Sequence, residues 1–206
     1  MTKIVSAALL LVMQVTSTYG ATLVDTGSPA ISSNGAVAVG KTQWMGVRFN
    51  LADSYNLTDI KSYFFSSGSS FGTLTLSLKG DSFGLPGVEL YSQEFLIPAN
   101  LGKNWFGVSD INWQVASGDY WVTYEVRDTQ TYTGSLEFPA PSLLTAAVKN
   151  DYYTDWTILN NHGFGLIVSG EPVSSVPEPL AIYQMAVGLI AVFVLTRRRP
   201  VVLSNC

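Results

Sequence analysis

Alternation of apolar and polar side chains is the feature that most restricts what this chain can fold into. In the clearest segment, residues 120–127, Tyr120, Val122, Tyr124 and Val126 alternate with Trp121, Thr123, Glu125 and Arg127. Successive side chains of a β-strand point to opposite faces, so the segment is predicted to be a strand with one face in the core. The periodicity of an amphipathic helix is almost absent from residues 21–175.

The rest of this region predicts several more short strands. Glycine- and proline-containing stretches separate them, above all the turn-rich connection at residues 80–87. Residues 143–148 fit either a helical turn or a strand. Many short strands without helices between them predict an all-β fold, an antiparallel β-sandwich or jelly-roll-like domain over residues 21–170. The other expected strands are residues 44–50, 57–65 (with a bulge or bend), 73–79, 88–97, 105–108, 152–159 and 163–169.

The first twenty residues have the parts of a secretory signal peptide. Lys3 supplies the positive charge, and residues 4–13 are apolar but too few to span a membrane. Thr18 and Gly20 are the small residues expected at positions −3 and −1 of a cleavage site before Ala21. We therefore expect a signal helix over residues 1–20, the export machinery as a partner, and signal peptidase cleavage between Gly20 and Ala21.

The last thirty residues predict one transmembrane helix over residues 180–196. Residues 180–195 contain no charged side chain and are closed by Thr196 and the basic stop Arg197, Arg198 and Arg199. About 16 helical residues span about 25 Å, slightly less than a hydrocarbon core of about 30 Å. The positive-inside rule places the tail of residues 197–206 in the cytoplasm. The alternative is a buried C-terminal core helix.

A short proline-rich motif stands just before this apolar run, after a linker that begins at residue 171. It reads Val176, Pro177, Glu178, Pro179. The order of motif, apolar helix and arginine cluster resembles the PEP-CTERM sorting signal of Gram-negative bacteria, although the tail is longer than usual. That resemblance covers residues 176–199. It implies recognition by an exosortase, a membrane-embedded cysteine protease–transpeptidase, and a link to extracellular polysaccharide and biofilm matrix. The protein would be anchored in the inner membrane before processing and then reach the cell surface or the matrix.

The middle of the chain carries a second, less specific resemblance. Residues 74–78 read LTLSL, residues 84–90 read GLPGVEL, and residues 116–122 read ASGDYWV. This series is similar to the sandwich domains of anchored, exported bacterial proteins. The resemblance implies a fold, and it assigns no catalytic residue.

Charge and cysteine usage exclude several classes of function. Residues 21–175 contain seven Lys and Arg against fourteen Asp and Glu, a net charge of −7. An acidic domain without a basic patch argues against nucleic acid as a partner. The only cysteine, Cys206, lies in the predicted cytoplasmic tail. The exported domain therefore has no disulfide, cysteine nucleophile or cysteine metal site.

No catalytic constellation stands out, and we expect no enzyme. His162 is the only histidine, and it sits in an Asn-Asn-His-Gly turn without a G-x-S-x-G motif, which favours a solvated turn residue over a catalytic triad with Asp151 or Asp155. A carboxylate pair of the glycosidase kind cannot be chosen among fourteen acids. One histidine cannot supply a zinc site.

Ligand binding stays open around a few aromatic and acidic residues. Tryptophan rings of a sandwich either pack in the core or stack on sugar rings. The candidates for ligand contact are Trp121, Trp156, Asp151 and Asp155. The same hairpin, with Asn160 and Asn161, could bind calcium or simply form Asx turns. The main hypothesis is a non-enzymatic surface or matrix protein; the alternatives are a carbohydrate-binding module with polysaccharide as partner and, third, a hydrolase.

Overall fold

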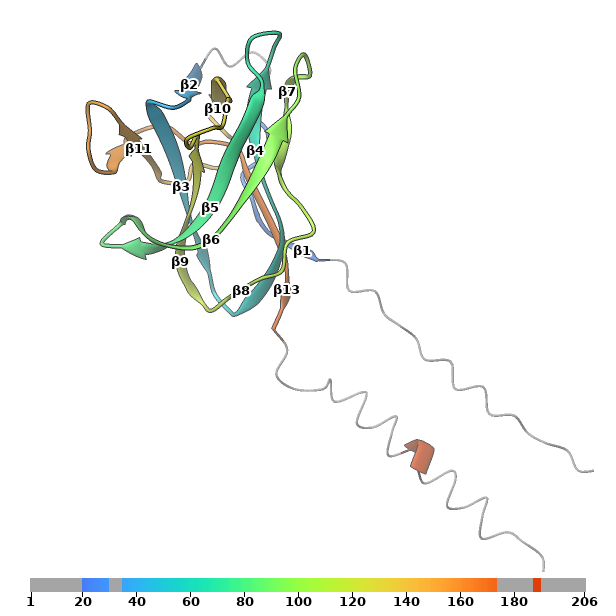
Figure 1. Ribbon diagram of the computed structural model, residues 1–206. Coiled ribbons are helices and arrows are strands. Elements are labelled where there is room, and N and C mark those ends of the chain that lie inside the picture. The colour runs from blue at the N-terminus through green and yellow to red at the C-terminus, as the bar shows by residue number, and fades with distance from the viewer. Residues whose placement is uncertain (1–19, 30–34, 174–186, 190–206) are drawn as a thin grey trace, which may run out of the picture. The chain divides into compact units, whose positions relative to one another are not determined.

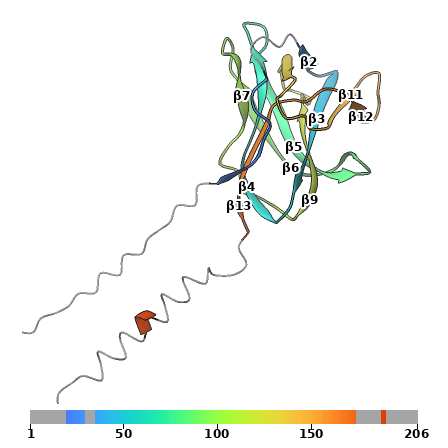
Figure 2. The same cartoon turned by 180° about the vertical axis from the view of Figure 1, so that it is seen from behind.

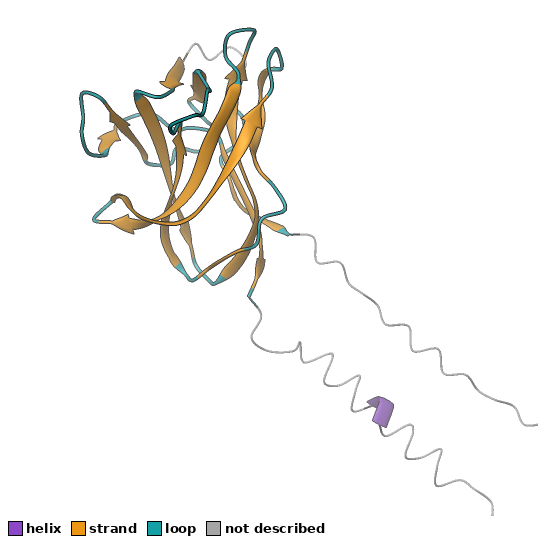
Figure 3. Cartoon of the chain, in the orientation of Figure 1, coloured by secondary structure: helices purple, strands orange, loops and turns teal. Residues whose placement is uncertain are grey.

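The computed structural model describes residues 20–29, 35–173 and 187–189. The chain divides into two compact units, residues 1–172 and 173–206. Thirteen strands are described, and all of them belong to the first unit (Figure 1). The described part of the second unit is Val173 and one helical turn at residues 187–189, the purple element of Figure 3.

The strands form two antiparallel sheets, which confirms the predicted all-β class. The seven-stranded sheet has the order β1-β13-β4-β10-β2, with β7 and β8 also pairing with β4. Its strands are β1 (Ala21–Asp25), β2 (Gly35–Val39), β4 (Tyr55–Ser66), β7 (Gly102–Val108), β8 (Trp113–Val115), β10 (Gly134–Phe138) and β13 (Leu166–Pro172).

The six-stranded sheet has the order β12-β11-β3-β9-β5-β6, so that β9 lies near its centre. Its two longest strands, β5 and β6, form a hairpin at one edge. The strands are β3 (Gln43–Leu51), β5 (Gly72–Ser82), β6 (Leu85–Ile97), β9 (Gly118–Glu125), β11 (Ala146–Asn150) and β12 (Thr157–Leu159).

The core lies between the two sheets, and β9 supplies its centre. Tyr120, Val122 and Tyr124 are all buried, as the alternation predicts. Tyr124 meets Phe64 of β4 edge to face, with ring centroids 5.1 Å apart, and its hydroxyl hydrogen-bonds the hydroxyl of Ser62. Burial raises the pKa of the Tyr124 hydroxyl above its usual range, so the group stays protonated and tied to the opposite sheet.

The strand expectations hold best where alternation is strong. Residues 44–50 lie in β3 and residues 73–79 in β5, and the bulge expected in residues 57–65 falls at Thr58 of β4, which the register with β13 skips. Residues 143–148, left open between helix and strand, contribute to β11.

Two expectations, one about a connection and one about a strand, are wrong. The connection expected at residues 80–87 shrinks to Phe83 and Gly84, because β5 continues to Ser82 and β6 begins at Leu85. Both turn residues have positive φ, 54° and 82°, and the amide of Gly84 donates to Asp81. Within residues 152–159 only the last three form a strand, β12.

The first and last strands of the sandwich pair with each other, with Ala21 opposite Gly170 (Figure 2). The last strand, β13, ends at Pro172, two residues beyond the expected boundary at 170. Residues 1–19 of the predicted signal helix (residues 1–20), the motif at 176–179 and the tail at 197–206 lie outside the described residues. Of the predicted membrane helix only residues 187–189 are described, and no helix in the described ranges is long and apolar enough to cross a membrane.

The core interpretation predicts unequal effects of two phenylalanine truncations. Phe64 is fully buried against Tyr124 and Tyr132, whereas Phe83 is fully exposed at a hairpin turn. We expect Phe64→Ala to lower the free energy of unfolding by about 3–5 kcal/mol. The control, Phe83→Ala, should change it by less than about 0.5 kcal/mol. Urea unfolding followed by tryptophan fluorescence measures both, and equal losses would contradict this assignment of the core.

Candidate functional site

The outer face of β9 carries the largest polar network of the described residues. The sequence pattern leaves Trp121, Thr123 and Glu125 on the polar side of the strand, yet their exposed fractions are 0%, 0% and 1%. The turn end of the β5–β6 hairpin accounts for part of this burial. A Cβ added to Gly46 of β3 would lie 3.5 Å from Pro86 of β6 and 3.3 Å from the Trp121 ring, so the hairpin packs over this face.

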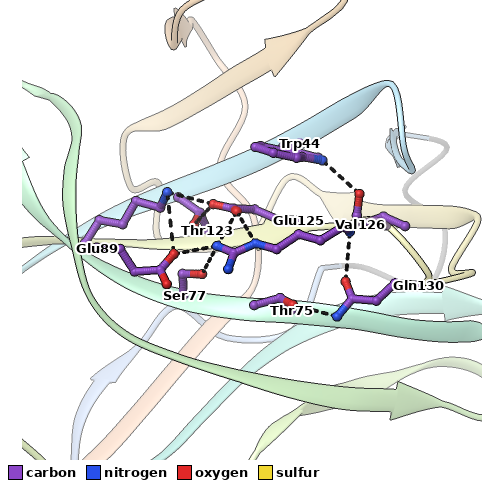
Figure 4. A network of polar contacts seen from close by, with 10 residues as sticks. Trp44, Thr75, Ser77, Glu89, Thr123, Glu125, Val126 and Gln130 are labelled. Atoms are coloured by element: carbon purple, nitrogen blue, oxygen red, sulfur yellow. Dashed lines mark hydrogen bonds and ion pairs between the residues drawn. The ribbon is translucent and has the colours of Figure 1, made fainter.

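Glu125 is the buried centre of a charge network on this face (Figure 4). Its carboxylate lies 2.9 Å from the ammonium of Lys79 on β5 and accepts hydrogen bonds from the guanidinium of Arg127. Arg127 also contacts Glu89 of β6 and donates to Ser77 of β5. The network therefore ties three strands together, with the Lys79–Glu125 pair largely removed from water and the Arg127–Glu89 pair at the surface.

Contacts within the network favour the charged forms of Glu89 and Arg127. Burial pushes the pKa of Glu89 up, but hydrogen bonds from Arg127 and Ser92 outweigh it and hold that pKa below its usual value. Burial lowers the pKa of Arg127, but its hydrogen bonds to Glu89 and Glu125 outweigh burial and hold that pKa above its usual value. A glycosidase acid needs a raised pKa, so Glu89 lacks the property that a general acid requires.

A second cluster sits at the other end of β9. Arg48 of β3 lies 3.0 Å from Asp81 and 3.0 Å from Asp119, the first contact being an ion pair without hydrogen-bond geometry. The indole N–H of Trp121 donates to the same Asp81 at 2.8 Å. Asp81 stands near the turn of the β5–β6 hairpin, so this cluster holds the turn end of that hairpin over the sheet.

The structure does not bring the predicted ligand-contacting residues together. Trp121 is buried on β9, whereas Trp156 precedes β12 and is half-buried, and Asp151 and Asp155 are exposed. The strands β11 and β3 lie between β12 and β9, a separation of about 14 Å at the usual strand spacing. Trp121 is therefore a packing residue and offers no free face to a ligand.

The remaining tryptophans are also at least half-buried. Trp113 is buried and stacks on Tyr91, with ring centroids 5.4 Å apart. Trp44 and Trp105 are half-buried, and Trp105 meets Tyr63 edge to face. All five tryptophans lie among the described residues, and none is fully exposed.

His162 makes local contacts. Its Nδ1 lies 2.7 Å from the carbonyl oxygen of Asn160, and its ring packs on Phe138 at 4.6 Å between centroids. The contacts described for His162 include neither Asp151 nor Asp155. In the described ranges no three His, Cys, Asp or Glu side chains gather as a metal site, and calcium at this hairpin remains a prediction.

Sequence reasoning missed the network around Glu125, which holds Lys79, Glu89 and Arg127. One signal could have indicated part of it, because Lys79 and Glu125 each stand on the polar face of a strongly alternating strand. Comparison with known proteins adds no assignment to this face: no protein-family model matches the chain, and no curated protein matches it.

The network predicts a stability cost for losing its arginine. Replacing Arg127 by methionine keeps the aliphatic stem but leaves buried Glu125 with Lys79 as its main counter-charge. We expect the free energy of unfolding to fall by about 1–3 kcal/mol.

Lys61 offers the matched control, since its ion pair with Asp59 lies on the other sheet and is partly exposed to water. Lys61→Met should cost less than about 1 kcal/mol. Urea unfolding of both variants decides the point, and an Arg127→Met variant as stable as the parent would show that the network contributes no net stability.

Proposed function

We propose that this chain is an exported, non-enzymatic protein of the cell surface or extracellular matrix, sorted by an exosortase and associated with extracellular polysaccharide. One observation carries the proposal: the motif Val176, Pro177, Glu178, Pro179 is followed by the apolar run 180–195 and then by Arg197–Arg199. Each part alone is a weak signal, but their order, together with an export signal at residues 1–20, is specific.

The architecture of the sandwich supports removal of both targeting segments. Strand β1 begins at Ala21, one residue after the proposed signal peptidase site at Gly20, and β13 ends at Pro172, before the motif. Because β1 and β13 pair with each other, residues 21–172 contain both strands at this side of the sheet. Cleavage at Gly20 or beyond Pro172 leaves every strand pairing of the sandwich in place.

In this proposal each end has a separate task. Signal peptidase cleaves between Gly20 and Ala21 during export. The helix at 180–196 then holds the protein in the inner membrane, and Arg197–Arg199 keep the tail in the cytoplasm. Proline cannot donate a backbone hydrogen bond and biases the preceding residue towards extended geometry, so the motif presents an extended segment with Glu178 as its charged handle. The exosortase recognises that segment and releases the sandwich for the surface.

The alternative, a carbohydrate-binding module with exposed aromatic rings, gains nothing from Trp121, because that side chain is buried. A hydrolase that uses Glu89 as its acid is also disfavoured, because the pKa of Glu89 is lowered.

Replacing Pro177, Glu178 and Pro179 by alanines tests the sorting step. The export signal and the apolar run are unchanged, so the variant should be exported but should accumulate at full length in the inner membrane. The reason is that alanines allow the helix to extend outward through the segment that the exosortase must bind. Fractionation of membranes and surface material, with immunoblotting, measures the distribution.

The matched control replaces Ser174 and Ser175 by alanine, just before the motif, and should reach the surface as the parent does. A strain without the exosortase should retain both proteins in the inner membrane. If the proline–glutamate–proline variant reaches the surface as well as the parent does, the motif is not a sorting signal.

A further inference from the structure

The described sandwich pairs most of its positive charges internally. It contains seven Lys and Arg, and five of them form ion pairs with Asp or Glu. Among the described residues, neither Lys41 nor Lys149 has a carboxylate oxygen within 4.0 Å. Lys41 and Lys149 are therefore the cations of the described sandwich whose charge no carboxylate partner offsets at close range.

Both lysines line the same hollow, which has a volume of about 170 Å³. It lies between the turn that joins β2 to β3 and the end of β11 with the residue that follows it. The amide of Asp151 donates to the carbonyl of Thr42 at 3.2 Å, which links these two segments just beyond the paired part of β3 and β11. The hollow is lined by Lys41, Thr42, Trp44, Lys149, Asn150 and Asp151.

Trp44 gives the hollow an aromatic wall. It stands on the outer face of β3, directly opposite Lys149 of β11 in the strand register. Its indole N–H donates to the carbonyl of Val126 at 3.4 Å, a contact drawn in Figure 4. The ammonium of Lys149 lies over the indole ring, 5.6 Å from its centre, in a cation–π contact.

The rim offers polar groups that suit hydroxyl groups. Thr42 and Asp151 are exposed, and they supply a hydroxyl and a carboxylate beside the two lysines. A second hollow of about 400 Å³ shares Lys41 and Thr42 with the first and continues towards residues 131–134. Tyr152, which follows Asp151 in the chain, is 84% exposed. A chain-like ligand that fills the first hollow can continue into the second.

We propose that this hollow binds an acidic saccharide, one sugar unit of which places its carboxylate between Lys41 and Lys149 and its ring beside Trp44, whose face carries the Lys149 ammonium. Asp151 and Thr42 bind the hydroxyl groups of the same unit. A few convergent polar groups around an aromatic surface are typical of small-ligand sites. Nucleic-acid binding depends on several phosphate contacts along a basic surface, whereas this hollow offers two lysines, enough for the one carboxylate of a sugar unit, so we favour the saccharide. The proposal goes beyond sorting and does not depend on the C-terminal motif.

The test is calorimetric titration of the full-length protein, purified in detergent, with tetramers of galacturonate, glucuronate and mannuronate. We expect at least one tetramer to bind, and its methyl-esterified, uncharged form to bind at least tenfold more weakly. Lys41→Ala should weaken binding about five- to tenfold while leaving the melting temperature unchanged, because Lys41 is exposed. The matched control, Lys61→Ala, should bind as the parent does.

Three outcomes would overturn the proposal. The first is no binding of any tetramer at millimolar concentration. The second is equal binding of the esterified form, which would remove the role of the carboxylate. The third is equal weakening by Lys41→Ala and Lys61→Ala, or tighter binding of a single-stranded oligonucleotide of the same charge, which would indicate non-specific attraction of anions or a nucleic-acid site. A protein that fails the sorting test but passes this one still has a saccharide site.

Discussion

Burial of both faces of β9 is the constraint on which the rest of the sandwich depends. Its inner face packs against the opposite sheet through Tyr124 and Phe64. Its outer face buries a carboxylate, that of Glu125, which is strongly destabilising unless it is paired. Lys79 of β5 and Arg127 supply the positive charges that pair with Glu125. Arg127 also pairs with Glu89 of β6. These ion pairs join β9 to both strands of the β5–β6 hairpin, in addition to the backbone pairing of β5 with β9.

The same constraint shapes the surface that the protein presents. Five of the seven Lys and Arg of the sandwich are paired with its own Asp or Glu. With twice as many acids as bases, the domain surface is acidic and offers little to nucleic acid or anionic lipid. The exceptions, Lys41 and Lys149, gather beside Trp44 and Asp151. In the proposed function the sandwich is a stable exported body whose delivery depends on the two ends of the chain, and the hollow beside Trp44 is its proposed site of recognition.

The sequence was informative wherever alternation was strong, and less so elsewhere. It predicted β3, β5 and the inner face of β9, because a period of two directly reports one buried face. It could not predict that Trp121 is buried, because alternation says nothing about a hairpin folding over the polar side. The short edge strands β1, β2 and β8 carry no pattern long enough to recognise.

The candidate site was harder to predict than the fold, for a physical reason. The network at Glu125 joins residues as distant in sequence as Ser77 and Arg127, and only strand order brings them together. The hollow likewise joins Lys41 to Lys149 through the pairing of β3 with β11. By contrast, the motif at 176–179 is local, so sequence alone suffices to propose its role.

The central claim is that both ends of this chain serve delivery and are removed from a sandwich that is complete without them. Intact-mass spectrometry of the protein recovered from the cell surface tests it most directly. We expect a species that begins at Ala21 and ends between Pro172 and Arg197, with every strand retained. A surface protein that still carries Met1 or extends to Cys206 would contradict the claim and would make the ends permanent parts of the mature molecule.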